Sequence, residues 1–254
     1  MLDTSTASLY AATGLALLVY TLERGFAMPI ASKLSAAKAT ASVFGALSGI
    51  GGLVHGVGEV LQGGVKVDGV IVNSWTSGPI ADHMGGEPGM TLIPDVRLSG
   101  ILTLVISAAI ILWSLAFLRK RRDGAVLVLL STGMLLVGGG FGPPIIGILA
   151  GLSGLGLGER EPSRITRHAG LVTRSLARMW PWVYGVGVAN GVFLVIGSYV
   201  AAYTVDADTS DLFLKSFFGQ VLALLLVVPA SFAYDSQRAI PAERALERGS
   251  LAYG

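Results

Sequence analysis

The sequence predicts an all-α fold: a polytopic membrane helix bundle of about seven passes, with the N-terminus outside and the C-terminus inside. Hydrophobic residues make up 52% of the 254 residues and charged residues only 13%, about half the share usual in soluble domains. Of the 18 Lys and Arg, 15 fall in four stretches, 23–39, 119–123, 159–179 and 235–254. These stretches share one side if seven segments cross a bilayer in alternation, as the positive-inside rule requires. We expect a single transmembrane domain, residues 1–254, in a prokaryotic plasma membrane.

Three hydrophobic segments in the first half of the chain are long enough to cross a bilayer: 6–22, 40–62 and 98–118. A spanning helix needs about 20 apolar residues, with about 17 as the lower limit. No basic residue precedes the first segment and Arg24 follows it, which does not fit a cleaved signal peptide. This order of charges predicts an outside N-terminus.

The stretch 124–158 is apolar throughout but contains the string Gly138-Gly-Gly-Phe-Gly-Pro-Pro144. Two adjacent prolines cannot continue a helix, because each ring removes a donor and clashes with the preceding turn. Basic clusters flank the stretch on both sides, so it should enter and leave the membrane on the same side. We expect a tight hairpin of two short helices, with a re-entrant loop as the alternative.

Segments 182–203 and 212–232 complete the seven passes, and the connections 63–97 and 204–211 then lie outside. Both connections are acidic. Residues 65–72 favour a small hairpin, because Asp68-Gly69 suits a type I′ turn. We expect 63–97 to be a structured outer loop, either a plain cap or a functional lid, since long loops are often functional.

On the inner side, the cytoplasmic segment 159–179 has the pattern of an amphipathic helix lying in the membrane plane, and 235–254 forms a cytoplasmic tail. An apolar face opposite an arginine face is typical of helices in the headgroup layer. The expected partners are therefore the lipid bilayer and its anionic headgroups rather than nucleic acid. Four arginines would contact the headgroups: Arg164, Arg167, Arg174 and Arg178.

The segment 40–62 carries three polar side chains on one helical stripe. His55, Glu59 and Gln62 stand at positions i, i+4 and i+7, near the outer end of the segment. An ionisable residue inside a membrane segment is costly and indicates a functional site. A histidine side chain could titrate near neutral pH at this position, and Glu59 could exchange a proton with His55 or hold a cation. The equally weighted alternative is a structural hydrogen-bonded pair that fastens the segment to the outer loop.

Small residues form two further stripes with the same 4-3-4 spacing. Such spacing lets neighbouring helices approach closely, so we expect two packing surfaces. A broken helix lined by glycine could instead expose backbone to an ion or substrate, as in transporters. The stripes are Gly45, Gly49, Gly52 and Gly56 before the Pro-Pro break, and Gly147, Gly151, Gly154 and Gly158 after it.

Four other polar residues are secondary candidates for binding. Asp82, His83 and Glu87 lie in the outer loop and could add ligands to the stripe. We expect no metal site, because the stripe offers two ligands where three or four are needed. Asn190 lies within segment 182–203, where an interhelical hydrogen bond, also open to Gln220, is the simpler interpretation.

Two strings resemble those of an uncharacterised family of prokaryotic multi-pass membrane proteins. They are His55-Gly-Val-Gly-Glu-Val-Leu-Gln-Gly63 and Gly138-Gly-Gly-Phe-Gly-Pro-Pro144. The resemblance covers roughly residues 40–157 and implies a multi-pass membrane protein without implying an activity.

A shorter string, Asp211-Leu-Phe-Leu-Lys-Ser-Phe-Phe-Gly219, resembles the last helix of microbial rhodopsins. Segment 98–118 supplies no acidic counter-ion, and Lys215 would lie at the outer mouth of its helix. We therefore expect no retinal and no other cofactor.

Together these features predict transport or binding of a small molecule or ion near the outer surface, around His55, Glu59 and Gln62. Two alternatives stay open: a non-catalytic subunit or scaffold of a membrane complex, and a membrane enzyme that uses His55 and Glu59 as an acid–base pair. We assign no catalytic residue, because the common catalytic motifs are absent, and this absence favours a function other than catalysis. A homo- or hetero-oligomer is compatible with the glycine stripes.

Overall fold

The computed structural model describes residues 35–158, 170–205 and 208–251, with side chains as far as 238. This part of the chain is mostly helical, as the sequence predicts. The elements are α3 (Ala36–Gln62), β1 (Ile71–Asn73), α4 (Pro79–Met84), β2 (Pro88–Met90), α5 (Val96–Leu112), the π-helical η2 (Trp113–Phe117), α6 (Arg121–Leu136), α7 (Gly142–Gly154), α9 (Gly170–Val192), the π-helical η3 (Phe193–Gly197), α10 (Ser198–Thr204) and α11 (Ser210–Leu251).

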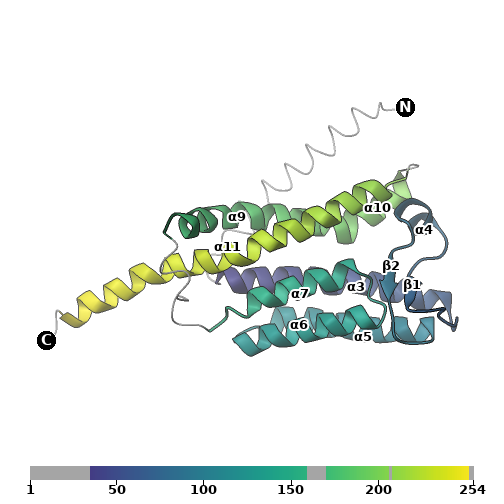
Figure 1. The fold of residues 1–254 in the computed structure, drawn as a ribbon, viewed down its shortest axis with the longest axis horizontal. Helices are drawn as coiled ribbons and strands as arrows, with labels where there is room; N and C mark the ends of the chain where they lie inside the picture. The colour runs from purple at the N-terminus through teal and green to yellow at the C-terminus, as the bar shows by residue number, and fades with distance from the viewer. Residues whose placement is uncertain (1–34, 159–169, 206–207, 252–254) are drawn as a thin grey trace, which may run out of the picture.

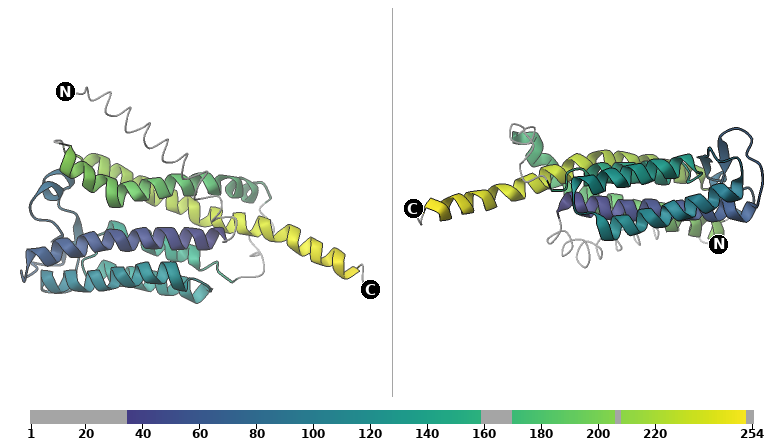
Figure 2. Two further views of the ribbon diagram at one scale, coloured as in Figure 1. Left: turned by 180° about the vertical axis from the view of Figure 1, so that it is seen from behind. Right: turned by 90° about the horizontal axis from the view of Figure 1, so that it is seen from below.

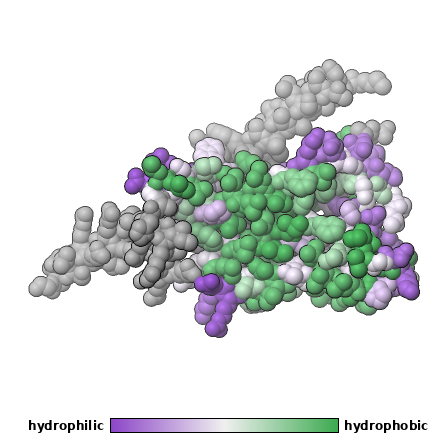
Figure 3. Space-filling model, viewed as in Figure 1, coloured by the Kyte–Doolittle hydropathy of each residue, from purple (hydrophilic) through white to green (hydrophobic). Residues whose placement is uncertain are grey.

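Four of the described helices are long and apolar enough to cross a membrane: Ala36–Gln62, Val96–Phe117, Gly170–Thr204 and Ser210–Arg238. They coincide with four of the predicted segments. The predicted segment 6–22 lies outside the described residues. Large apolar side chains face outward along these helices, and Figure 3 shows an apolar band between hydrophilic residues at the ends of the bundle. These features are those of a membrane protein.

The helices lie side by side along one axis (Figures 1 and 2). Helix α3 occupies the centre and contacts α5, α7, α9 and α11, while α6 packs on α7 and α9 packs on α11. The apolar core follows α3, with Phe44, Ile110, Leu127 and Trp180 fully buried. The central position of α3 places its polar stripe inside the protein.

Both glycine stripes lie at helix contacts, which confirms the prediction of packing surfaces. A Cβ atom added to Gly52 would meet Ser107 of α5, and one added to Gly151 would meet Val128 of α6. The first stripe packs on α5 and η2, and the second packs on α6. The exception is Gly158, which has open space beside it and a φ of 81°.

The predicted helical hairpin is present as α6 and α7, and its turn lies at the same end of the bundle as the 63–97 loop. The backbone N–H of Gly138 donates to the carbonyl of Met90, and that of Leu92 donates to the carbonyl of Leu136. Thr209, which precedes α11, donates to the carbonyl of His83 in the same loop. We call this end, formed by 63–97, 137–141 and 205–209, the loop end.

The prediction of a hairpin within residues 65–72 is wrong. Strand β1 pairs with β2 instead, in an antiparallel register that sets Val72 opposite Gly89. The backbones of Lys66 and Asp95 form an isolated antiparallel β-bridge. A turn does form beside Asp68, at Gly69 and Val70, but the chain then continues toward a distant partner. A local turn signal does not fix which strand pairs with which.

Residues 170–179 are helical, as predicted for the amphipathic segment, but they continue without a break into the spanning helix. The sequence predicted an amphipathic helix before Pro181 and a spanning helix after it. Pro181 lies inside α9, so these two predicted helices form one continuous helix. Arg174 and Arg178 are exposed on this helix, while Arg164 and Arg167 lie outside the described residues.

Candidate functional site

Two of the three residues of the polar stripe, His55 and Glu59, are enclosed at the loop end, and Gln62 is half-buried. His55 is 4% exposed and Glu59 is 0% exposed. Their polar partners come mainly from the 63–97 loop, which crosses the end of α3. Among the described residues, His55, Glu59 and Glu87 are the only buried His, acidic or basic side chains, so the enclosed charges have no Lys or Arg beside them in the interior.

Four side chains form a continuous polar chain. Glu59 Oε1 lies 3.3 Å from Ser74 Oγ, and Ser74 Oγ lies 2.8 Å from His55 Nδ1. His55 Nε2 is 3.4 Å from Glu87 Oε2. His55 and Glu59 are therefore connected through Ser74, whereas the sequence suggested direct interaction. We call Glu59, Ser74, His55 and Glu87 the carboxylate–histidine chain.

Glu87 is held in an uncommon backbone conformation. Its φ is 52°, and it is the one non-glycine residue with a positive φ in the described part of the chain. Such backbone strain is found preferentially at functional sites. The Tyr199 hydroxyl of α10 donates to Glu87 Oε1 at 2.7 Å, whereas Glu87 Oε2 has no hydrogen-bond partner. The strained backbone thus points a carboxylate inward, between α3 and α10.

The hydrogen-bond donors of Ser74 and His55 show how many protons this chain of side chains needs. Ser74 has one hydroxyl proton to donate. If Ser74 donates to Glu59, its oxygen accepts the Nδ1 proton of His55, and a neutral imidazole then presents a bare Nε2 to Glu87 Oε2. A bare Nε2 and a carboxylate oxygen 3.4 Å apart repel each other, so a proton on one of them is favoured in this arrangement. If Ser74 instead donates to Nδ1, the additional proton is needed at the Ser74–Glu59 contact.

The two glycine-rich strings of the sequence meet at this site. A Cβ atom on Gly138 would meet the carboxylate of Glu59, and one on Gly140 would meet the imidazole of His55. Both glycines have a positive φ, 105° and 74°, which L side chains adopt at a cost. The backbone of the α6–α7 turn thus closes the site where any other residue would collide.

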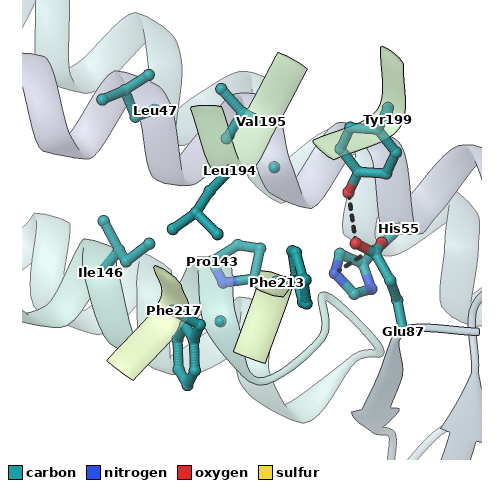
Figure 4. A pocket seen from close by; sticks show the side chains of 12 residues that line it. Leu47, His55, Glu87, Pro143, Ile146, Leu194, Val195, Tyr199, Phe213 and Phe217 are labelled. Carbon is teal, nitrogen blue, oxygen red and sulfur yellow. Dashed lines mark hydrogen bonds and ion pairs between the residues drawn. The ribbon is translucent and has the colours of Figure 1, made fainter. Parts of the chain in front are cut away.

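A small pocket adjoins the His55–Glu87 contact (Figure 4). Its volume of about 30 Å³ is room for roughly two water molecules. In Figure 4, Tyr199, His55 and Glu87 lie at one end, with Leu47 and Ile146 at the other. The remaining lining residues are mostly apolar: Gly51, Gly142, Pro143, Leu194, Val195, Phe213 and Phe217. A substrate of ordinary size needs about 300 Å³ or more, so this pocket suits a very small ligand.

The structure brings together some of the predicted site residues and separates others. Gln62 fastens the loop to α3, because its amide donates to the backbone carbonyls of Asn73 and Ser74. Asp82 is exposed on α4. His83 contacts Thr209 and Ser210 through its backbone carbonyl.

Two further polar side chains in the helices lie apart from the carboxylate–histidine chain. Asn190 joins α9 to α11 by donating to Gln220 and to the carbonyl of Ser216, as the simpler interpretation predicts. Lys215 is exposed and paired with Asp211, whereas a lysine that carries retinal would have to lie in the middle of the helix bundle.

Ser74 and Tyr199 are the site residues that sequence reasoning missed. Ser74 lies in a polar stretch of the loop, where a single serine carries no distinguishing pattern. Tyr199 carried no distinguishing signal either, since Tyr184, Ser198 and Tyr203 in the same segment also have hydroxyl groups. Its contact with Glu87 spans 112 positions, and no local pattern reports such a pairing.

Comparisons with protein-family models, with curated proteins and with solved structures found no match for this chain. Among the described residues, no group of three or more His, Cys, Asp or Glu side chains is placed to hold a metal ion.

Proposed function

We propose that this chain is a seven-pass protein of a prokaryotic plasma membrane that binds and relays a proton near the outer surface. The observation that carries the proposal is the carboxylate–histidine chain: two enclosed carboxylates linked through Ser74 and His55. The ion expected from the sequence is then a proton. We also propose that the chain belongs to the uncharacterised family that the two glycine-rich strings resemble.

The proposed topology follows from the order of the helices. Helices α3, α5, α6, α7, α9 and α11 run alternately toward and away from the loop end (Figures 1 and 2), and segment 6–22 adds the seventh pass. Basic residues near the opposite end, among them Arg119, Arg121 and Arg122, support an inside location for that end. Arg174 and Arg178, with Arg164 and Arg167, would contact anionic headgroups there.

The relay moves protons without changing their number. In one arrangement His55 is an imidazolium between two carboxylates, with Nδ1–H donating to Ser74 and the Ser74 proton donated to Glu59. Transfer of the Nδ1 proton to Ser74, as the Ser74 proton passes to Glu59, leaves neutral His55, protonated Glu59 and ionised Glu87. Both arrangements have a net charge of −1 and three protons shared among Ser74, His55 and the two carboxyl groups, so the change is a proton relocation.

Electrostatics favour a proton as the ion. Two ionised carboxylates and one imidazolium leave the enclosed site one positive charge short, and buried uncompensated charge costs several kcal/mol. Uptake of a second proton removes that deficit. Hard cations such as Ca²⁺ take about six to eight oxygen ligands, and the side chains here are not grouped in that way.

Proteoliposomes test the proposal directly. The purified chain is reconstituted with a pH-sensitive dye inside, and proton entry is driven by a potassium diffusion potential. We expect Glu59→Gln and Ser74→Ala to reduce proton entry at least tenfold, because each removes one step while keeping the side-chain shape. Asp211→Asn, which changes an exposed carboxylate at the same end, serves as the matched control and should keep full flux.

A second readout separates proton binding from transport. Infrared difference spectra between acid and alkaline pH should contain a protonated-carboxyl C=O band that Glu59→Gln or Glu87→Gln removes. If the wild-type band is absent and proton entry equals that of empty liposomes, the proposal is wrong.

The structural alternative also has a specific observation behind it. The polar partners of His55 lie in the 63–97 loop, and Gln62 adds two bonds to the same loop. In this second candidate function, the network fixes the loop to α3, and Glu59→Gln lowers thermal stability without any proton-linked signal.

The scaffold alternative has less support, because both glycine stripes pack on helices of this same chain. The small pocket likewise disfavours an enzyme.

A further inference from the structure

We infer that the pocket beside Glu87 binds a small monovalent nitrogen cation, of the size of ammonium or methylammonium. This inference rests on the proposed function, since it treats the same carboxylate–histidine chain as a site that lacks one positive charge. It goes beyond that function by naming a second ligand that can supply the charge in place of a proton.

The unpartnered carboxylate oxygen is the first argument. The Glu87 side chain is 2% exposed, it lines the pocket, and its Oε2 atom has no hydrogen-bond partner. The nearest possible donor, His55 Nε2, is 3.4 Å away and makes no hydrogen bond with Oε2, and a buried carboxylate oxygen without a hydrogen bond is costly. A ligand with N–H donors in the pocket would satisfy Oε2, and the Tyr199 hydroxyl oxygen beside it can accept a further hydrogen bond.

The size of the pocket limits the ligand. A volume of about 30 Å³ holds roughly two water-sized groups, which corresponds to one nitrogen atom and one methyl group. Tetramethylammonium and larger amines exceed this space. A ligand with both an ammonium head and a methyl group also matches the division of the pocket into a polar end and an apolar end (Figure 4).

The chemistry of the wall selects the type of cation. Besides Glu87, Tyr199 and His55, the pocket is lined by aliphatic and aromatic side chains, including Phe213 and Phe217 of α11. Such a wall offers too few oxygen atoms to replace the hydration shell of a metal cation. Aromatic rings attract organic and ammonium-type cations through their π faces. Ammonium and methylammonium therefore fit better than sodium or potassium.

Equilibrium dialysis of the purified full chain in detergent, with radiolabelled methylammonium at constant ionic strength, tests the inference. We expect one saturable site per chain, displaced by ammonium chloride but not by sodium chloride or tetramethylammonium chloride. Glu87→Gln should weaken binding at least tenfold, and Asp211→Asn should leave it unchanged. Val195→Phe, which fills the pocket without altering a polar residue, should also weaken binding at least tenfold.

The contrary results are equally specific. Absence of saturable binding to the wild-type chain, equal binding by Glu87→Gln, or displacement by sodium would overturn the inference. Should Glu87→Gln fail to fold, unchanged binding by Val195→Phe would overturn it alone. The carboxyl infrared bands give an independent reading: if they are present while methylammonium does not bind, the cation pocket is refuted and the proton relay stands.

Discussion

The carboxylate of Asp235 in α11 accepts a hydrogen bond of 2.7 Å from the backbone N–H of Ala36, the first residue of α3. Its second oxygen accepts from Ala37 at 3.0 Å. A side chain 199 positions away thus satisfies two of the N–H groups that the start of a helix leaves unpaired. Its negative charge also complements the helix dipole. This contact joins α11 to the central helix at the end opposite the site.

Replacing Asp235 by alanine should therefore destabilise the bundle by about 1 to 2 kcal/mol, the cost of losing a helix cap. The measurement is SDS-driven unfolding in mixed micelles, with Asp211→Asn as the control for loss of one charge on the same helix. Equal midpoints for Asp235→Ala and wild type would show that the contact contributes nothing.

Gly140→Ala should cost more than Gly69→Ala, although both glycines have a similar positive φ, 74° and 79°. Each substitution carries about 1 kcal/mol of backbone strain. At Gly140 the new methyl group also collides with the His55 ring, whereas at Gly69 nothing lies within 4 Å. Overpacking adds about 1 to 3 kcal/mol. Thermal unfolding of the two variants in detergent gives the comparison, and similar losses would refute close packing of the turn on His55.

Tyr199→Phe should lower stability by about 1.5 to 3 kcal/mol, because a hydrogen bond to a buried carboxylate is lost. Tyr203→Phe, one turn further along α10 and 62% exposed, should change stability by less than about 0.5 kcal/mol. The same pair should differ in the infrared carboxyl bands if Tyr199 donates to Glu87. Identical spectra for Tyr199→Phe and wild type would argue against that bond.

The topology can be measured with single cysteines, since the chain contains none. A membrane-impermeant maleimide should label Thr76→Cys in intact cells, because this exposed position lies in the 63–97 loop, for which we propose an outside location. Gly170→Cys should react only after the cells are permeabilised. Labelling of position 170 from outside intact cells would invert the proposed orientation.

The sequence predicted the parts of the fold that local patterns determine. The helix ends agree within a few residues at 40–62 and 98–118, because apolar length and flanking charge define them. The Pro-Pro break located the α6–α7 turn because proline is best tolerated in the first turn of a helix, and Pro143 and Pro144 lie at the start of α7. The strand partner of residues 71–73 was missed, since pairing across the loop depends on contacts that alternation of residue types does not encode.

The candidate site was predicted in part. His55 and Glu59 were identified because ionisable residues stand out in an apolar segment, whereas Glu87 was only one of three polar loop residues considered as secondary candidates. Their connection through Ser74 could not be predicted, because it requires the loop to fold back over α3. Asp82 and His83 were grouped with Glu87 by proximity in sequence, yet the short helix α4 directs Asp82 into solvent.

Helix α11 is long enough to contact both the pocket and the opposite end of the bundle. The helix continues for 42 residues, which is about 63 Å at 1.5 Å per residue. It carries Phe217 at the pocket and Asp235 at the first turn of α3, 18 positions apart. A tilt of about 5° around Phe217 would displace Asp235 by roughly 2.4 Å along this rod, enough to break its hydrogen bonds to α3. The pocket wall and the cap on α3 thus belong to one helix, so a small rotation of α11 at the pocket would move the carboxylate that caps α3.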